Sequence, residues 1–131
     1  MYKHILMPLA YQPGHSPKVE TRAARAISAP GAHITLLHVI GPIPEFRSEH
    51  ATTREGLAEV IRHDLERIAN DFVDAEVEVR EGDPATQILD LADAGDIDCI
   101  VMAPHRSDAA DYGSTAAQVL RHAPCTVHLV R

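Results

Sequence analysis

Patterns typical of strands and of helices alternate along all 131 residues of this chain. Apolar runs of strand length are followed by longer stretches in which apolar residues recur at helical spacing. Strands that alternate with helices form a parallel sheet covered on both faces, and right-handed crossovers restrict the topology to a doubly wound α/β sandwich. The sequence therefore predicts one domain, residues 1–131, with strands at 4–9, 33–40, 75–80, 99–102 and 125–130.

Local signals predict where the helices lie and which side chains they bury. Ser16 and Asp83 are the expected caps of the first and third helices, each followed by a proline at the first helical position. Pro30-Gly31 is expected to end the first helix, and the second and fourth helices are predicted over 52–71 and 115–121. The apolar spacing predicts the buried side chains, which are Val19, Ala23, Ala26 and Ile27 in the first helix, Leu57, Val60, Ile61, Leu65, Ile68 and Phe72 in the second, and Ile88, Leu89 and Ala92 in the third.

Composition and charge exclude several classes of function. A net charge of −7 argues against nucleic acid and anionic membrane surfaces as partners, because both attract a basic protein. No apolar run approaches the roughly 20 residues of a membrane span, and no signal peptide precedes the first strand. We therefore expect a cytoplasmic protein without membrane insertion. Cys99 and Cys125 lack metal-ligand spacing and are expected to be reduced and buried, and the nine scattered histidines predict no metal site.

The last third of the chain, residues 97–131, contains the clearest candidate site. Its first apolar run leads into a polar loop, and the loop ends in Gly113-Ser114-Thr115 just before a helical pattern. A helix that starts after such a loop presents backbone N–H groups to an anion. In doubly wound sheets, ligands bind at the carboxyl ends of the strands, where the strand order reverses. The loops at 9–16 and 103–114 are therefore expected to flank a binding crevice.

Four stretches of the chain match the pattern of one protein family, and the last of them is the most specific. They are Tyr2–Pro8, Ile34–Ile40, Glu81–Pro84, and Val119–Cys125 with Val127–Arg131. With these residues, the whole chain resembles the universal stress protein family. The resemblance implies an adenine-nucleotide alpha-hydrolase-like, Rossmann-like fold, with a five-stranded parallel sheet in the order 3-2-1-4-5.

Many members of this family bind ATP through the motif Gly-x2-Gly-x9-Gly-[Ser/Thr], which starts at the fourth strand. In this chain Ala103 and Arg106 occupy the first two glycine positions, and Gly113-Ser114 closes the motif. The start, Ala-x-His-Arg with His105, resembles a subgroup that has arginine at the second position. Six residues separate Arg106 from Gly113, so the loop is shorter than the family motif by 9 − 6 = 3 residues.

The resemblance also implies where the parts of an adenine nucleotide lie. The adenine ring is placed against the end of the first strand, beside Ala10, where family members usually carry an aspartate. The ribose lies near the end of the fourth strand, and the phosphates lie at the loop and at the start of the fourth helix. The expected nucleotide-binding residues are Pro8, Leu9, Ala10, Val39, Met102, Ala103, His105, Arg106, Gly113, Ser114 and Thr115.

Several of these residues also fit a purely structural role. Gly113 suits a plain turn, and Thr115–Gln118 fits a capping box that would occupy the Thr115 hydroxyl. Arg106 either holds phosphate or forms an ion pair with Asp108 or Asp111. The same two aspartates either hold the Mg²⁺ that accompanies ATP or are solvated turn formers.

The last strand, 125–130, is apolar and is expected at a sheet edge, where it can pair with another strand. The resemblance implies a homodimer formed by these strands. The alternative is a monomer in which His128 and Arg131 shield the edge.

Two functions fit these observations. The first is a cytoplasmic, dimeric stress-response protein that binds ATP or AMP as a regulatory ligand. It would not be an enzyme, because no catalytic base, Walker lysine or carboxylate pair is evident. The second is a dimeric scaffold that does not bind nucleotide and serves a protein partner which the sequence does not identify. Ala10, Ala103 and the shortened loop favour the second. A transferase or hydrolase would need a glycine-rich or basic loop after the first strand, and residues 11–15 do not supply one.

Overall fold

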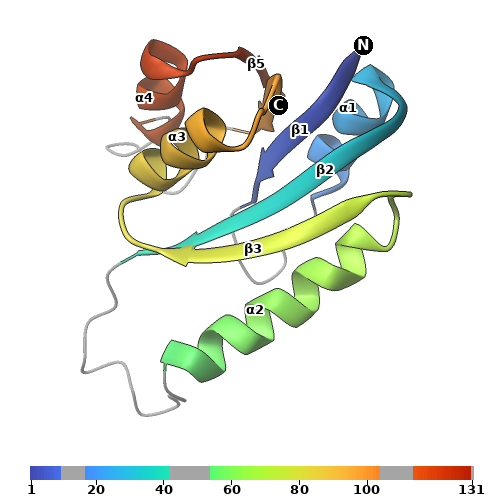
Figure 1. Ribbon diagram of the computed structural model, residues 1–131. Helices are drawn as coiled ribbons and strands as arrows, with labels where there is room; N and C mark the ends of the chain where they lie inside the picture. The colour runs from blue at the N-terminus through green and yellow to red at the C-terminus, as the bar shows by residue number, and fades with distance from the viewer. Residues whose placement is uncertain (10–16, 42–53, 104–113, 131) are drawn as a thin grey trace.

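The computed structural model describes residues 1–9, 17–41, 54–103 and 114–130. Its five strands form one parallel sheet in the order β3-β2-β1-β4-β5 (Figure 1). The predicted α/β class and the strand order are confirmed. The strands are β1 Tyr2–Pro8, β2 Ser28–Ile40, β3 Ala75–Glu81, β4 Cys99–Met102 and β5 Thr126–Leu129.

Within the described residues, four helices cover the two faces of the sheet. Side chains from α1 (Lys18–Ile27) and α2 (Arg54–Ala69) join one apolar cluster on one face. Side chains from α3 (Pro84–Ala94) and α4 (Ser114–His122) join a second cluster on the other face. The ribbon shows α2 running along β3, and α3 and α4 packed together on the opposite side (Figure 1).

The central strands β1 and β4 supply the middle of both clusters. Ile5 and Met7 point to the α1/α2 face and Leu6 points to the other, and all three side chains are 0% exposed. All four residues of β4 are buried as well. A strand covered on both faces has no wet side, so its sequence is apolar throughout instead of alternating. This explains why the short run at 99–102 could be assigned from the sequence.

The cap of α3 agrees with the sequence prediction. The Asp83 carboxylate accepts hydrogen bonds from the Thr86 backbone N–H at 3.0 Å and from the Thr86 hydroxyl at 2.8 Å. Pro84 occupies the first turn, where its missing N–H leaves no bond unmade. At the other end, the Gly95 N–H donates to the Leu91 carbonyl at 2.9 Å. These local bonds fix both ends of α3.

The junction between α1 and β2 differs from the prediction. Pro17 is the N-cap residue of α1, not its first helical residue, and Ser16 lies outside the described residues. The helix ends at Ile27, and β2 begins at once and runs through Pro30-Gly31. A bulge accommodates this turn pair, since the register changes between the pairs Tyr2↔Ser28 and His4↔His33, and Gly31 has φ +75°.

Two of the predicted helix faces are partly wrong. In α1, Val19 is 44% exposed and Ala26 is exposed, whereas Glu20 and Ala24 are buried. In α2, Val60 is 51% exposed, although Ile61 and Leu65 are buried as expected. The last strand is also shorter than predicted, at Thr126–Leu129 in place of 125–130.

Candidate functional site

The order of the strands reverses between β1 and β4. The chain passes from β1 to β2 and β3 on one side, then returns to place β4 and β5 on the other side of β1. The pairs Ile5↔Cys99 and Leu6↔Ile100 set the register of the two central strands. Their carboxyl ends therefore lie side by side at one edge of the sheet, as does the end of β2. This edge is where doubly wound folds bind ligands.

Hydrogen bonds hold the backbone at this edge in place. The Leu9 N–H donates to the Leu37 carbonyl at 2.8 Å, and the Val130 N–H donates to the Met102 carbonyl at 3.0 Å. The His38 Nδ1 atom lies 2.8 Å from the Leu9 carbonyl oxygen. A carbonyl only accepts, so we assign the ring hydrogen to Nδ1. Burial lowers the pKa of His38, and the ring is therefore neutral at pH 7.

The strand-end side chains predicted to bind the adenine ring and the ribose do not share one face of the sheet. Leu9 is 6% exposed and belongs to the cluster beneath α1 and α2. Val39 and Met102 belong to the cluster beneath α3 and α4. Pro8 is half-buried at the end of β1. An adenine ring packed on Val39 would therefore lie on the face of the sheet opposite to the Leu9 side chain. Leu9 would not contact the ring through its side chain, which packs in the core beneath α1 and α2.

The start of α4 supplies the candidate anion site. A helix that connects two parallel strands runs antiparallel to them, so α4 begins at the edge where β4 ends. It begins at Ser114, which makes Thr115 the second helical residue. The prediction that Thr115 caps this helix is therefore wrong, because the helix starts one residue earlier. The first N–H groups of a helix have no intrahelical partner and carry the positive end of its dipole.

The remaining predicted site residues cannot be placed from the structure. Ala10, His105, Arg106 and Gly113 lie outside the described residues, as do Asp108 and Asp111. Ala103 is described and half-buried, directly after β4. The structure thus brings Pro8, Val39, Met102 and Ala103 to one edge of the sheet, next to the strand ends described above.

The described residues contain no group of three or more His, Cys, Asp or Glu side chains arranged to hold a metal ion. Cys99 is buried and Cys125 is half-buried, and both are free thiols. Burial raises the pKa of Cys99 to about 11 and also raises that of Cys125, so both are protonated and unreactive at neutral pH. Within the described part of the chain, no helix is long and apolar enough to cross a membrane.

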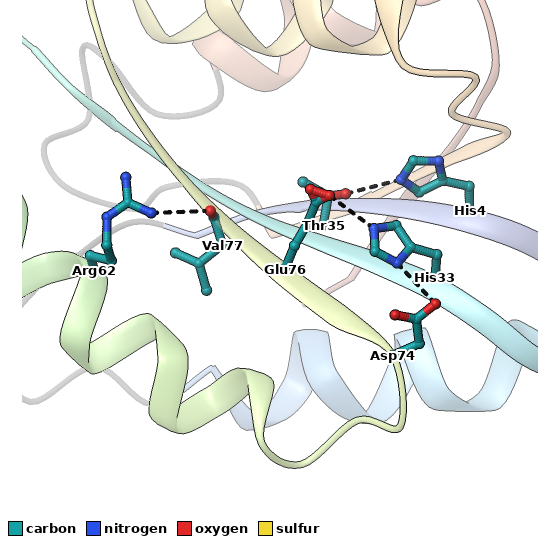
Figure 2. Close-up of polar contacts among 7 residues, drawn as sticks. All are labelled: His4, His33, Thr35, Arg62, Asp74, Glu76 and Val77. Carbon is teal, nitrogen blue, oxygen red and sulfur yellow. Dashed lines mark hydrogen bonds and ion pairs between the residues drawn. The ribbon is translucent and has the colours of Figure 1, made fainter.

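The sequence analysis treated the histidines as scattered, but the structure brings two of them together. His4 of β1 and His33 of β2 have ring centroids 4.7 Å apart in an edge-on arrangement. The two ring nitrogens of His33 lie 3.1 Å from Asp74 and 3.0 Å from Glu76, and His4 Nε2 lies 2.9 Å from Thr35 Oγ1 (Figure 2). The sequence did carry a signal for this cluster. Polar residues stand near the start of three predicted strands whose other residues are apolar or alternate between apolar and polar.

Comparison with known proteins agrees with the fold and with the residue pattern. The family model of the universal stress protein family matches residues 1–131. The chain belongs to the universal stress protein family. A universal stress protein of Methanothermobacter thermautotrophicus is 47% identical over 55 residues, which cover 40% of this chain and 38% of that relative.

Solved universal stress proteins have the same fold. The protein from Lactobacillus plantarum superposes with a TM-score of 0.73 at 24% identity, covering 99% of this chain and 98% of that one. A universal stress protein in complex with cAMP has a TM-score of 0.70 at 19% identity, covering 99% and 97%. The protein from Archaeoglobus fulgidus in complex with dAMP has a TM-score of 0.65 at 19% identity, covering 99% and 98%. Two of these solved proteins are thus complexes with an adenine nucleotide.

Proposed function

We propose that this universal stress protein binds ATP or AMP as a regulatory ligand in the stress response, in a cytoplasmic homodimer. The observation that carries the proposal is the reversal of strand order between β1 and β4. It brings Pro8, Met102 and the start of α4 to the same edge of the sheet. The solved relatives with dAMP and cAMP support adenine as the base.

In this proposal each part of the edge has one task. Apolar side chains at the strand ends, Pro8 and Val39 among them, give the adenine ring a surface, and Met102 lies beside the ribose. Ala103 lies where the ribose approaches the backbone. The N–H groups of Ser114 and Thr115, with Gly113, hold the phosphates, and Arg106 adds a charged donor. Loop aspartates such as Asp108 and Asp111 are the candidates for a Mg²⁺ ion that accompanies ATP.

The nucleotide acts in this proposal as a signal and not as a substrate. Fast phosphoryl transfer needs a positioned base or water-orienting residue in addition to a phosphate cradle. One titratable group at this edge is His38, and its Nδ1 hydrogen is already directed at the Leu9 carbonyl. Binding can thus change the conformation of the edge, and with it the choice of a protein partner, without turnover.

The departures from the family motif favour a second function, a dimeric scaffold that does not bind nucleotide. Ala103 and Arg106 replace the first two glycines, and Ala10 stands where an aspartate is usual. A methyl group at position 103 adds bulk where the backbone must approach the ribose closely. In that case the protein acts through its surface alone.

One experiment separates the two functions. The protein is purified without added ligand and denatured, and the released small molecules are identified by mass spectrometry. Calorimetric titration with ATP and AMP follows, on the wild type and on the Arg106→Ala and Gly113→Val variants. We expect binding that weakens roughly tenfold or more in Arg106→Ala, because a charge-assisted hydrogen bond is lost. No binding at millimolar nucleotide favours the scaffold, and binding unchanged in both variants shows that the site lies elsewhere.

The proposed dimer uses the exterior strand β5. This strand has one neighbour in the sheet, β4, and its Leu129 side chain is 38% exposed. An exterior strand with exposed apolar side chains can pair with the same strand of a second copy. Sedimentation at micromolar concentration tests this arrangement.

A further inference from the structure

A cluster of charged groups lies near the amino ends of β1 and β3, beside His33 of β2, at the edge of the sheet opposite to the proposed nucleotide site. His4 comes from β1, His33 from β2 and Glu76 from β3, and Asp74 directly precedes β3. Figure 2 shows the ring of His33 between the two carboxylates, with His4 and Thr35 beside it. This cluster has no part in the function proposed above.

The geometry of His33 favours a charged ring. Its Nδ1 atom lies 3.1 Å from Asp74 Oδ2, and its Nε2 atom lies 3.0 Å from Glu76 Oε2. An ionised carboxylate only accepts hydrogen bonds, and a neutral imidazole carries a single N–H. Only the imidazolium form can donate to both carboxylates at once. Losing the proton leaves one nitrogen lone pair facing a carboxylate lone pair.

The same contacts bind the beginning of β3 to the sheet. β3 is an exterior strand whose one neighbour in the sheet is β2. The first rung between them is the hydrogen bond from the Ile34 N–H to the Asp74 carbonyl, at 3.0 Å. Glu76 pairs with Thr35 in the sheet, and its side chain is the next one after Asp74 on the same face. His33 thus spans the point where the turn after α2 joins the sheet.

We propose that His33 is a proton-dependent clasp, closed as the imidazolium between Asp74 and Glu76 and loosened when the ring loses its proton, so that solution pH sets how firmly the start of β3 is held to β2. The clasp is open to solvent, since the side chains of His33, Asp74 and Glu76 are 30%, 59% and 53% exposed. Protons therefore reach it without any opening of the core.

Other titratable and charged groups also lie around the clasp. Burial, and next the charge on His33, lower the pKa of His4, and its Nε2 atom lies 2.9 Å from the Thr35 hydroxyl oxygen. Asp98, directly before β4, accepts from the Lys3 and His4 backbone N–H groups at 2.9 and 3.0 Å. Further along β3, Glu78 pairs with Arg80 at 3.0 Å.

The direction of the pH dependence follows from these contacts. Burial alone would lower the pKa of His33, but hydrogen bonds to Glu76 and Asp74 outweigh it, and the pKa is raised above 6.5. A group with a raised pKa in the folded state stabilises that state fully below its ordinary pKa. The stabilisation is lost as the pH rises through the folded-state value. The clasp therefore tightens on acidification and loosens towards alkaline pH.

The first test measures the proton on His33 directly. Imidazole resonances are titrated by NMR between pH 5 and 9 in the full chain and in the Asp74→Asn, Glu76→Gln double variant. We expect a His33 pKa above 6.5 in the wild type that falls to 6.5 or below in the double variant, because burial then acts without the carboxylates. His63, exposed on α2, is the internal reference. A His33 pKa that is not raised, or that is unchanged in the double variant, overturns the proposal.

The second test measures how firmly the start of β3 is held to β2. Hydrogen exchange is followed at the amides of Ile34 and Glu76, corrected for the intrinsic pH dependence of exchange. Protection should fall with rising pH by at most about tenfold for each pH unit between the unfolded and folded pKa values of His33. The pH dependence should vanish in His33→Gln and persist in His63→Gln. If His33→Gln does not fold, Glu76→Gln serves in its place. Protection that does not change with pH in the wild type overturns the proposal.

Discussion

The ring of His38 and the carbonyl of Leu9 join the ends of two strands at the proposed ligand edge, with Nδ1 and oxygen 2.8 Å apart. Leu9 is the first residue after β1, and its N–H already donates to Leu37 of β2. Both backbone groups of Leu9 are therefore bonded to β2. This geometry fixes the point at which the chain leaves the sheet to form the loop after β1.

Replacing His38 tests how much this bond contributes. His38→Phe removes the donor and leaves the Leu9 carbonyl short of a partner in a half-buried position, which we expect to cost about 1–3 kcal/mol of unfolding free energy. His38→Asn keeps an N–H near the position of Nδ1 and should cost less. Urea unfolding followed by circular dichroism measures both variants. Equal stability of the two would show that the bond is unimportant.

The protonation of His38 predicts a second pH effect. Burial lowers the pKa of His38 below 6.5 in the folded state. A group with a lowered pKa contributes stability above its ordinary pKa, and this contribution is lost as the pH falls through the folded value. Wild-type stability should therefore decline below pH 6.5 more steeply than that of His38→Asn. The measurement is the urea midpoint of both proteins between pH 5 and 8, and parallel curves would contradict the prediction.

A glycine after β3 is expected to resist substitution. Gly82 has φ +135°, and a Cβ atom there would lie 3.1 Å from Gln87 Nε2. Its N–H also donates to the Ile40 carbonyl at 3.0 Å. Gly82→Ala should cost about 1–3 kcal/mol through backbone strain. Gly41→Ala is the matched control, since nothing lies within 4 Å of its added Cβ and its φ is not in the strained range. Similar unfolding midpoints for the two would refute the assignment of strain.

The proposed dimer predicts a selective effect on β5. Leu129→Glu places a charge on the exterior strand and should raise the dimer dissociation constant about tenfold or more, because the carboxylate would lose its hydration at the interface. Val60→Glu changes a side chain that is 51% exposed on α2 and should leave the dimer intact. Analytical ultracentrifugation compares the two with the wild type. Dimerisation unaffected by Leu129→Glu would place the interface elsewhere.

Restoring the first glycine of the family motif is expected to raise the affinity for nucleotide. Ala103→Gly removes the methyl group where the ribose is proposed to approach the backbone, and should tighten AMP binding roughly fivefold. Ala26→Gly, at an exposed position of α1, is a control that lowers helix stability without touching the edge. Calorimetry measures both. Weaker binding in Ala103→Gly than in the wild type would show that the alanine methyl is itself a contact.

Local sequence signals predicted part of the fold correctly, and they failed where two faces of a helix fitted the pattern equally well. The Asp83 cap and strand β4 could be assigned because each depends on neighbours in the chain. Two sets of residues in α1 recur at helical spacing. One is Val19, Ala23, Ala26 and Ile27, and the other is Glu20, Ala23, Ala24 and Ile27. The apolar choice was the natural prediction, yet the structure buries Glu20 and exposes Val19.

The candidate site could be predicted only in outline. The sequence located the strand ends and the start of the helix before β5, and the reversal of order between β1 and β4 follows from the family pattern. It did not reveal that Leu9 and Val39 point to opposite faces, because this depends on where each strand enters the sheet. Thr115 was expected as a cap, but the helix begins one residue before it.

By itself the sequence determined that this protein is a parallel α/β sandwich, because apolar runs such as 99–102 can be buried only between two layers of helices. Only the tertiary structure decided which residues distant in the chain meet. His33 lies beside Asp74 and Glu76 because β2 and β3 pair in one particular register, and a shift of one residue would turn these side chains to the other face.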